Sequence, residues 1–333
     1  MQSASLFQRI LSWLERLFGQ QPAPEPEPPP VEPGAARTTR VSLILFDPRL
    51  ESQGGQRLSQ ALGWNDPDRL VAELIADLRE VSHGYAEYVI AERILADEFP
   101  VKEDGFRYSE AEYLRLVRER RGMHEPDAVD YGKILADYDL PGKINRGEID
   151  EVWTFSFPWA GFYESRMAGP GAFWCNAPPQ PDGEQSRRRF VIMAFNYERG
   201  VGEMLESYGH RAESILARVF RTVPAATNLW ERFTRHEKSH PGQAEAGNVH
   251  FAPNSRQDYD WGNPTPVLSR WRAWLSFPDL TGDPQLSDCH DWGSGDIRAH
   301  HKWWFNLMPH SAGQSLGIAN NWWVYIVDPN TVR

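Results

Sequence analysis

Residues 189–220 read RFVIMAFNYERGVGEMLESYGHRAESILARVF, and the hydrophobic pattern changes once within this stretch. Residues 189–196 form a short, strongly apolar run, which is typical of a strand buried on both faces. From about Arg199 the apolar side chains recur every three or four positions, which predicts a helix up to Phe220. A buried strand that leads directly into a helix is the repeating unit of a parallel sheet covered by helices.

The same alternation runs through the preceding residues. Three further apolar runs predict strands, at residues 41–46, 85–94 and 151–157. Three segments with helical spacing predict helices, at residues 66–81, 109–120 and 127–138. We therefore expect an α/β fold with a mostly parallel sheet flanked by helices, whose ligand region lies beyond the carboxyl ends of the strands. Those ends present Asp47, the loop with Glu164, and residues 196–198.

By composition, the chain divides into four parts. Residues 1–20 carry apolar side chains at helical spacing and predict an amphipathic helix, and residues 21–39 form a Pro/Glu-rich linker. Residues 40–220 hold the predicted α/β core. Residues 221–333 predict a loop-heavy cover rich in Trp and His that packs on the core, since ten of the 14 tryptophans lie from Trp174 onward.

Size and charge exclude several classes of function. With 333 residues, 41% of them hydrophobic, the chain can bury a large core without disulfides. A formal net charge of −11 argues against a non-specific grip on nucleic acid, so no nucleic-acid partner is expected. The sequence contains no phosphate-binding loop, nucleophile elbow or complete dinucleotide fingerprint. ATP and NAD chemistry are therefore disfavoured.

Location and partners follow from the N-terminal segment. No window has the ~20 apolar residues of a membrane span, and the start lacks a secretory pattern, so we expect a cytoplasmic protein. The apolar stripe of helix 1–20 needs a partner, either another protein or a second copy. A membrane surface ranks below these because the polar face carries little positive charge. Cys175 and Cys289 form no metal or redox motif, and the sequence leaves open whether they form a disulfide with each other.

A candidate metal site lies on the polar face of the helix at 199–220. Glu206 and His210 are four residues apart, so their side chains project side by side and can reach one ion. His250, in a predicted short strand at 247–251, is the third candidate ligand. One carboxylate and two imidazoles would leave an open position on a divalent metal, with zinc first and iron or manganese as alternatives. A water bound there would become a nucleophile.

The stretch from Glu206 to His210, which ends in Tyr208-Gly209-His210, is similar to the zinc helix of HExxH metallopeptidases. Glu206 stands where that pattern has its first histidine, and Ser207 stands where it has the general-base glutamate. The likeness spans five residues and implies at most a metal site with different ligands and another base. Polar helix faces more often simply contact water, so the test is whether the C-terminal cover encloses this one.

Other residues are candidates for supporting roles. Three acids could serve as general base, namely Glu203, Glu213 and Glu164. Five residues are candidates for substrate contact, namely Asn196, Tyr197, Asp258, Asp260 and Asn320. For Asn320 the alternative is that it closes the turn before a final strand at 324–327. Cys175 has apolar neighbours that fit an inert core thiol better than a nucleophile.

The leading hypothesis is a metal-dependent hydrolase that acts on a peptide, amide or glycosidic bond. A metal-free glycosidase is one alternative, with Glu164 and one of Glu203, Glu206 or Asp260 as paired carboxylates and tryptophans stacked on sugar rings. The other alternative is a non-catalytic module that binds a glycan or a protein through exposed aromatic side chains. That module would require tryptophans in a solvent-facing row.

Overall fold

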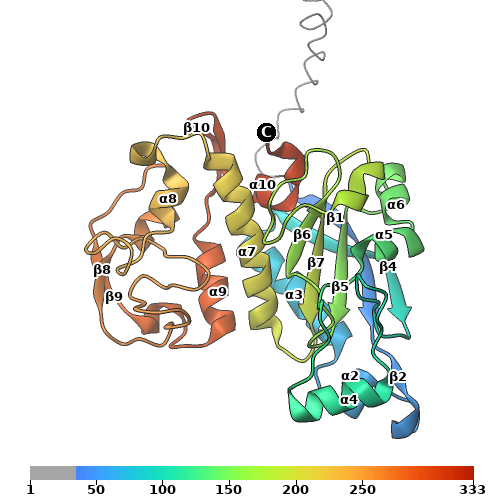
Figure 1. Ribbon diagram of the computed structural model, residues 1–333. Helices are drawn as coiled ribbons and strands as arrows, with labels where there is room; N and C mark the ends of the chain where they lie inside the picture. The colour runs from blue at the N-terminus through green and yellow to red at the C-terminus, as the bar shows by residue number, and fades with distance from the viewer. Residues whose placement is uncertain (1–34) are drawn as a thin grey trace, which may run out of the picture. The chain divides into compact units, whose positions relative to one another are not determined.

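A five-stranded sheet in the order β4-β1-β5-β7-β6 forms the centre of the first half of the fold (Figure 1). The computed structural model describes residues 35–333, apart from the side chain of Glu184, so the predicted helix 1–20 and most of the linker lie outside the described residues. The strands are β1 Arg37–Phe46, β4 Ala86–Ala96, β5 Glu151–Ser156, β6 Ser165–Ala168 and β7 Phe190–Asn196. The strands β4, β1, β5 and β7 run parallel to one another, and β6 pairs antiparallel with β7, which confirms the expected α/β fold.

Helices cover both faces of this sheet. On one side lie α3 (Pro67–Val81) and α7 (Val201–Phe220), and on the other lie α5 (Tyr131–Asp137) and α6 (Leu140–Arg146). Two more helices, α2 (Leu58–Ala61) and α4 (Glu110–Glu119), lie beyond the carboxyl ends of the strands. The capping box expected at Ser109 and Glu112 is present at the start of α4. Helix α5 starts later than predicted because the Asp130 side chain caps it by accepting from the Lys133 amide.

Short elements and loops make up the C-terminal region. Its helices are α8 (Leu229–Phe233), α9 (Ile297–Asn306) and α10 (Trp323–Val327), and its hairpins pair β8 (Val267–Ser269) with β9 (Gln285–Ser287) and β10 (His310–Ser315) with β11 (Ile318–Asn321). A further small hairpin, near the end of β1, pairs β2 (Arg49–Leu50) with β3 (Gln56–Arg57). The 3-10 helices are η1 Glu51–Gln53, η2 Pro181–Gln185, η3 Ala225–Thr227, η4 Trp271–Ser276, η5 Cys289–Trp292 and η6 Pro329–Thr331. Within residues 35–333 no helix has the length and apolar character needed to cross a membrane.

Two predicted strands of the C-terminal region are wrong. Residues 247–251 form a tight loop, in which the Asn248 side chain accepts from the amides of His250 and Phe251 and competes with strand pairing. Residues 323–327 form α10 instead of a strand. The Asn321 side chain accepts from the Trp323 amide at its start, and the buried residues face the core at helical spacing.

Glycines let the C-terminal region approach α7 closely. A Cβ at Gly202 would lie 2.4 Å from a methyl carbon of Ile297 in α9, and one at Gly209 would lie 2.6 Å from a methyl carbon of Val249. Both contacts are too short for any real side chain, so only glycine fits. Because the two positions are seven residues apart, they lie on one face of α7. Figure 1 accordingly shows α7 between the sheet and the C-terminal region.

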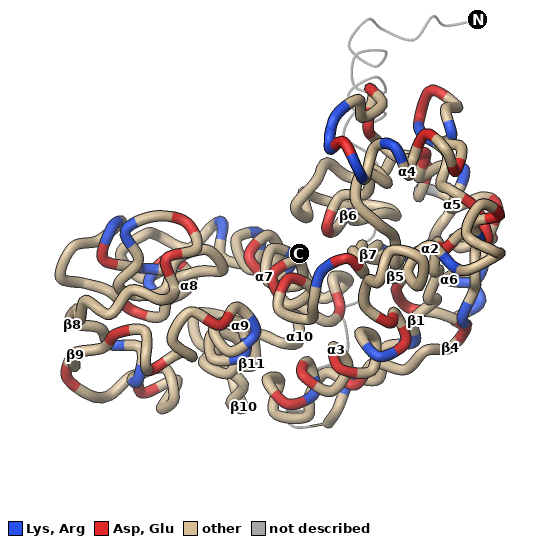
Figure 2. Tube along the Cα trace, turned by 90° about the horizontal axis from the view of Figure 1, so that it is seen from below, with Lys and Arg blue, Asp and Glu red and all other residues tan. Residues whose placement is uncertain are grey.

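Most tryptophans of the described chain serve as core. Six are essentially inaccessible to solvent, namely Trp153, Trp274, Trp292, Trp304, Trp322 and Trp323. Trp274, Trp304 and Trp322 pack around Phe233 at ring-centroid distances of 4.9–5.9 Å. Aromatic rings of this size supply much of the buried apolar area of a region with little regular structure. Along the chain trace, Lys and Arg positions are interspersed with Asp and Glu positions (Figure 2).

A fully buried ion pair joins α7 to the sheet and to the end of the chain. The Arg211 guanidinium donates to the Glu151 carboxylate on β5 at 2.5 Å and to the carbonyls of Ile326 and Val327 at the end of α10. The Trp153 indole N–H donates to the same Glu151 oxygen at 2.7 Å. The partners of this charge therefore come from two other elements of the fold, β5 and α10.

Replacing Arg211 by Met should lower the free energy of unfolding by about 3–5 kcal/mol, because it leaves the Glu151 charge buried with only a neutral partner. Urea denaturation measures this loss. Arg218→Met is the matched control, since Arg218 lies on the exposed side of the same helix, and it should change stability by about 1 kcal/mol or less. Equal effects of the two substitutions would contradict the role given to Arg211.

A second prediction concerns acid stability and His236, whose ring stacks on Phe251 at 4.4 Å. Burial, and then the nearby His240 and Lys238, lower the pKa of His236 to about 4. In the unfolded chain His236 is protonated below about pH 6.5, whereas in the folded chain it is protonated only below about pH 4. The free energy of unfolding therefore falls as the pH drops from about 6.5 to about 4.

The His236→Leu variant should lose on the order of 2 kcal/mol less between pH 6.5 and 4 than the unchanged protein. Urea denaturation at a series of pH values gives the two slopes. The exposed His240 provides the control, because His240→Leu should keep most of the slope. A His236→Leu slope as steep as that of the unchanged protein would refute the assignment.

Candidate metal centre

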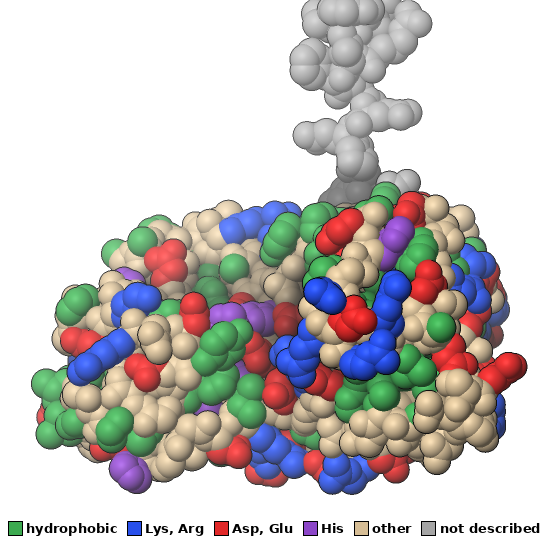
Figure 3. Space-filling view, turned by 60° about the horizontal axis from the view of Figure 1, so that its bottom comes forward, with side chains coloured by type: hydrophobic (Ala, Val, Ile, Leu, Met, Phe, Trp, Pro, Cys, Tyr) green, Lys and Arg blue, Asp and Glu red, His purple; other side chains and the backbone are tan. Residues whose placement is uncertain are grey.

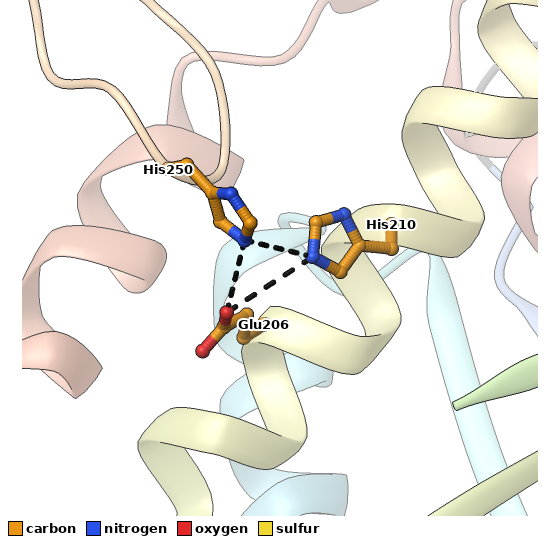
Figure 4. Close-up of side chains that lie close together, drawn as sticks. All are labelled: Glu206, His210 and His250. Carbon is orange, nitrogen blue, oxygen red and sulfur yellow. Dashed lines mark hydrogen bonds and ion pairs between the residues drawn. The ribbon is translucent and has the colours of Figure 1, made fainter. Parts of the chain in front are cut away.

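Helix α7 and the loop after Gly247 bring Glu206, His210 and His250 together (Figure 4). The Nε2 atoms of His210 and His250 lie 3.1 Å apart, and His250 Nε2 lies 3.1 Å from Glu206 Oε1. The third distance, from His210 Nε2 to Glu206 Oε1, is 4.0 Å. All three side chains are largely buried. The tertiary structure therefore joins the three residues that the sequence pattern proposed as metal ligands.

The outer nitrogens of the two histidines face carboxylates. His210 Nδ1 lies 3.0 Å from Glu213 Oε2, and His250 Nδ1 lies 3.6 Å from Asp258 Oδ1. A carboxylate at Nδ1 favours the tautomer that carries its proton there, which leaves the Nε2 lone pair bare. Two lone pairs and a carboxylate oxygen then point at one another. Such an arrangement needs a proton or a metal ion between the atoms.

The spacing of these atoms fits a metal ion. Ligands that bind zinc tetrahedrally at 2.0–2.1 Å lie about 3.3 Å from one another. Two of the three distances within the centre, at 3.1 Å, are close to that value, and the third, at 4.0 Å, is longer. The residues present fit a divalent cation.

Electrostatics also favours positive charge at this place. Burial alone would lower the pKa of His210, yet the hydrogen bond and charge of Glu213, with Glu164 and Glu206, raise it. The hydrogen bond to Glu206 raises the pKa of His250 against burial and the neighbouring His210. Burial raises the pKa of Glu206, but the histidines around it and the Tyr259 hydroxyl lower it overall. The carboxylates thus stabilise a cation among the imidazoles.

The loop that carries His250 is held in place from two sides. The Val249 amide donates to Glu213 Oε1 at 3.1 Å, and the Val249 carbonyl lies 3.2 Å from Nε2 of the buried His301 on α9. Glu213 therefore orients His210 with one oxygen and anchors the His250 loop with the other. This carboxylate, predicted as a general base, has both oxygens engaged in positioning.

A cleft of about 280 Å³ lies at the carboxyl ends of β5 and β7 and reaches the centre. Its lining includes Trp159, Phe162, Glu164, Asn196, Glu203 and Glu206. Glu164 Oε2 lies 3.9 Å from His210 Nε2, and the Asn176 side-chain amide donates to it at 2.5 Å. Figure 3 shows histidine and acidic side chains gathered in a hollow of this face. A cleft thus lies beyond the strand ends, where the sequence pattern predicts the ligand region.

Several predicted site residues do other work. Glu203 lines the cleft but accepts from the Gly200 amide at the start of α7. Tyr197 lies in the core, where its hydroxyl donates to the Phe46 carbonyl, so it does not line the cleft. Asp47 is buried too, and accepts from the amide and the hydroxyl of Ser59. The alternation of side chains along a strand explains why both residues are buried, since successive side chains at a strand end point in turn toward the cleft and toward the core.

Two further candidates hold loops. Asp260 Oδ2 accepts from the Arg256 amide and from the Asn263 side chain, which ties together the loop after His250. Asn320 donates to the Ala312 carbonyl and accepts from Ser315, so it closes the hairpin of β10 and β11. Asn320 therefore has the alternative role predicted for it, that of a turn residue. A helix, α10, follows it in place of the predicted strand.

Sequence reasoning missed two residues next to the centre. The Tyr259 hydroxyl lies 3.1 Å from Glu206 Oε1 and 3.3 Å from His250 Nε2, and Asn176 holds Glu164. The sequence feature that could have pointed to Tyr259 is its position nine residues after His250 and between Asp258 and Asp260. Nothing in the sequence pattern pointed to Asn176, whose backbone adopts the left-handed conformation with φ of 52°.

The cysteines do not bridge, and one contributes to a second group of potential ligands. Cys175 and Cys289 are both free and buried, and burial raises the pKa of Cys175 to about 11, which fits an inert thiol. Asp288, Cys289 and His290 could also hold a metal ion. They are consecutive at the start of η5, where the N-cap residue Asp288 already accepts from the His290 amide through Oδ1, and this oxygen lies 2.8 Å from Nδ1 of the His290 ring. That group is a local turn motif.

None of the protein-family models, curated proteins and solved structures compared with this chain matches it. Its function must therefore be inferred from the geometry and chemistry of the centre itself.

Proposed function

We propose that this protein is a metal-dependent hydrolase whose divalent ion, zinc in the first place, is held by Glu206, His210 and His250. The observation that carries the proposal is the convergence of one carboxylate oxygen and two imidazole Nε2 atoms, each imidazole backed by a carboxylate at Nδ1. Two imidazoles and one carboxylate are a common ligand set of catalytic zinc, and also suit iron. A cleft at the centre provides room for a substrate.

A divalent ion in this position would lower the pKa of a water molecule and polarise the bond to be cleaved. Glu164 is the best-placed general base, because it lies 3.9 Å from His210 Nε2, lines the cleft and is partly exposed. Asn176 donates to Oε2, the Glu164 oxygen that lies nearest to His210, so Oε1 is the oxygen that would take the proton. Glu213 and Glu203 are less suited, since each accepts a backbone N–H that positions the site.

The bond class remains a peptide, amide or glycosidic bond. Trp159 and Phe162 give the cleft an apolar wall, and Asn196 adds a side-chain amide that can donate to a carbonyl or a hydroxyl. Each of the three bond classes presents such an acceptor next to apolar groups.

The two alternatives have less support. A two-carboxylate glycosidase needs one carboxylic acid with a raised pKa, whereas the hydrogen bonds and charges around Glu206 outweigh its burial and lower its pKa, which counts against Glu206 as that acid. A non-catalytic module that binds through a row of exposed tryptophans is disfavoured, because most tryptophans of the described chain are buried. Trp174, at 59% exposure, is an exception.

The proposal predicts one zinc, manganese or iron ion per chain after purification without a polyhistidine tag. Elemental analysis measures the stoichiometry, and calorimetric titration of the metal-free protein with zinc measures the affinity. The His210→Ala variant should lose this binding, while His290→Ala, which removes a ligand of the η5 group, should retain it. Absence of bound metal, together with no zinc-induced rise in Tm, would refute the proposal.

A second experiment tests the carboxylate behind His210. In Glu213→Gln the amide can donate to His210 Nδ1, which moves the ring proton to Nε2 and removes the lone pair that a metal needs. Zinc affinity should fall by about 10- to 100-fold, the usual cost of losing an outer carboxylate partner. Glu231→Gln, at the start of α8, is the control and should leave the affinity unchanged. Equal affinities in both variants would show that Glu213 does not orient His210.

A further inference from the structure

Tyr259 lies where a fourth ligand would complete the centre. Its hydroxyl is 3.1 Å from Glu206 Oε1 and 3.3 Å from His250 Nε2, so it contacts two of the three proposed ligand atoms. Its ring packs against the His250 ring at a centroid distance of 4.7 Å. The hydroxyl therefore faces the same point in space as the carboxylate and the imidazoles.

The distances describe a nearly complete tetrahedron. Four oxygen and nitrogen atoms around one ion define six edges, and the five that join Tyr259, Glu206, His210 and His250 by direct contact measure 3.1, 3.1, 4.0, 3.1 and 3.3 Å. Four of these are close to the edge of about 3.3 Å expected for a zinc ion with bonds of 2.0–2.1 Å. The hydroxyl, which donates a hydrogen bond to Glu206, thus already lies at the spacing that a fourth ligand would have to two of the ligand atoms.

The backbone holds Tyr259 in a strained conformation on a firmly tied loop. Its φ is 61°, in the left-handed region that is unfavourable for a residue other than glycine. The Tyr259 amide donates to the His250 carbonyl, and Asp260 ties the loop to Arg256 and Asn263. Strain of this kind persists only where the surroundings enforce it, and it is concentrated at functional sites.

The side chain, by contrast, has room to move. Tyr259 is 55% exposed although its hydroxyl points inward. Only the Trp261 indole, perpendicular at 5.2 Å, and the His250 ring flank it among the aromatic side chains of residues 35–333. Rotation about the side-chain bonds can therefore carry the hydroxyl out to solvent while the loop stays in place.

We propose that Tyr259 is the fourth ligand of the metal centre and that substrate must displace it. This inference rests on the proposed function. Coordination forms one metal–oxygen bond and releases the phenol proton to solvent, with no change of oxidation state. With Tyr259 bound, the four-ligand centre is closed, as in structural zinc sites, and with Tyr259 displaced it has the open position of a catalytic site. When substrate displaces it, the phenolate takes a proton back from solvent and leaves as a neutral hydroxyl.

Copper(II) provides a direct probe, because a phenolate bound to it produces a charge-transfer band in the visible spectrum. The tag-free, metal-stripped full chain is loaded with one equivalent of copper(II) and its absorption and resonance Raman spectra are recorded. Tyr259→Phe should abolish the band and the phenolate vibrations. Tyr163→Phe is the matched control, an exposed tyrosine next to Glu164, and should leave both unchanged.

Zinc titration adds a second readout. Tyr259→Phe should bind zinc at least about tenfold more weakly, the lower end of what the loss of an outer partner costs. Tyr259→His keeps a ligand at this position, so it should recover zinc affinity without the phenolate band. Circular dichroism of each variant checks that the fold is retained.

The outcomes separate the two proposals. Stoichiometric copper with identical spectra in the unchanged protein and Tyr259→Phe would overturn the role of Tyr259 and leave the three-residue centre in place. Loss of the band in Tyr259→Phe alone supports the fourth ligand. Failure of the unchanged protein to bind copper or zinc would overturn both the centre and the ligand.

Discussion

The guanidinium group of Arg211 connects the parts of this fold on which the centre depends. It is buried in the space between the sheet, α7 and α10, and its hydrogen bonds run to Glu151 on β5 and to two carbonyls at the end of α10. A buried charge is tolerable only when each donor finds a partner, so the three elements cannot shift independently. Arg211 directly follows His210, and the rotation of α7 that satisfies the guanidinium also sets the direction of the imidazole.

The other face of α7 is closed by contacts that only glycine permits. Gly202 and Gly209 allow Ile297 and Val249 to approach the helix axis, and this approach brings the His250 loop within reach of Glu206. Val249 then connects α7 to α9 through Glu213 and His301. The cover is rigid at this point because every polar backbone group of Val249 has a partner.

The balance of charge distinguishes this cluster from an ordinary polar helix face. Glu164, Glu206 and Glu213 surround two imidazoles in a partly buried place, where water screens their mutual repulsion poorly. A proton relieves part of this repulsion, and a divalent cation relieves more. The η5 group differs, since Asp288 and His290 satisfy each other within one turn and His290 is mostly exposed.

Periodicity along the chain was sufficient to establish the parallel strands, the long helix and the capping box at Ser109, because local spacing alone decides which face of an element is apolar. It also identified Glu206 and His210 as neighbours, since a helix places residues four apart side by side. It failed for residues 247–251 and 323–327, where Asn248 and Asn321 side chains bond to the backbone and override the strand pattern.

Only the tertiary structure brings His250, Glu164 and Tyr259 to the helix. These residues lie 40 or more positions away from Glu206 or His210 along the chain, and no local pattern encodes contacts across such a separation. Their meeting results from long-range packing at Gly202, Gly209 and Arg211, in which one segment must fit the shape and charge of another.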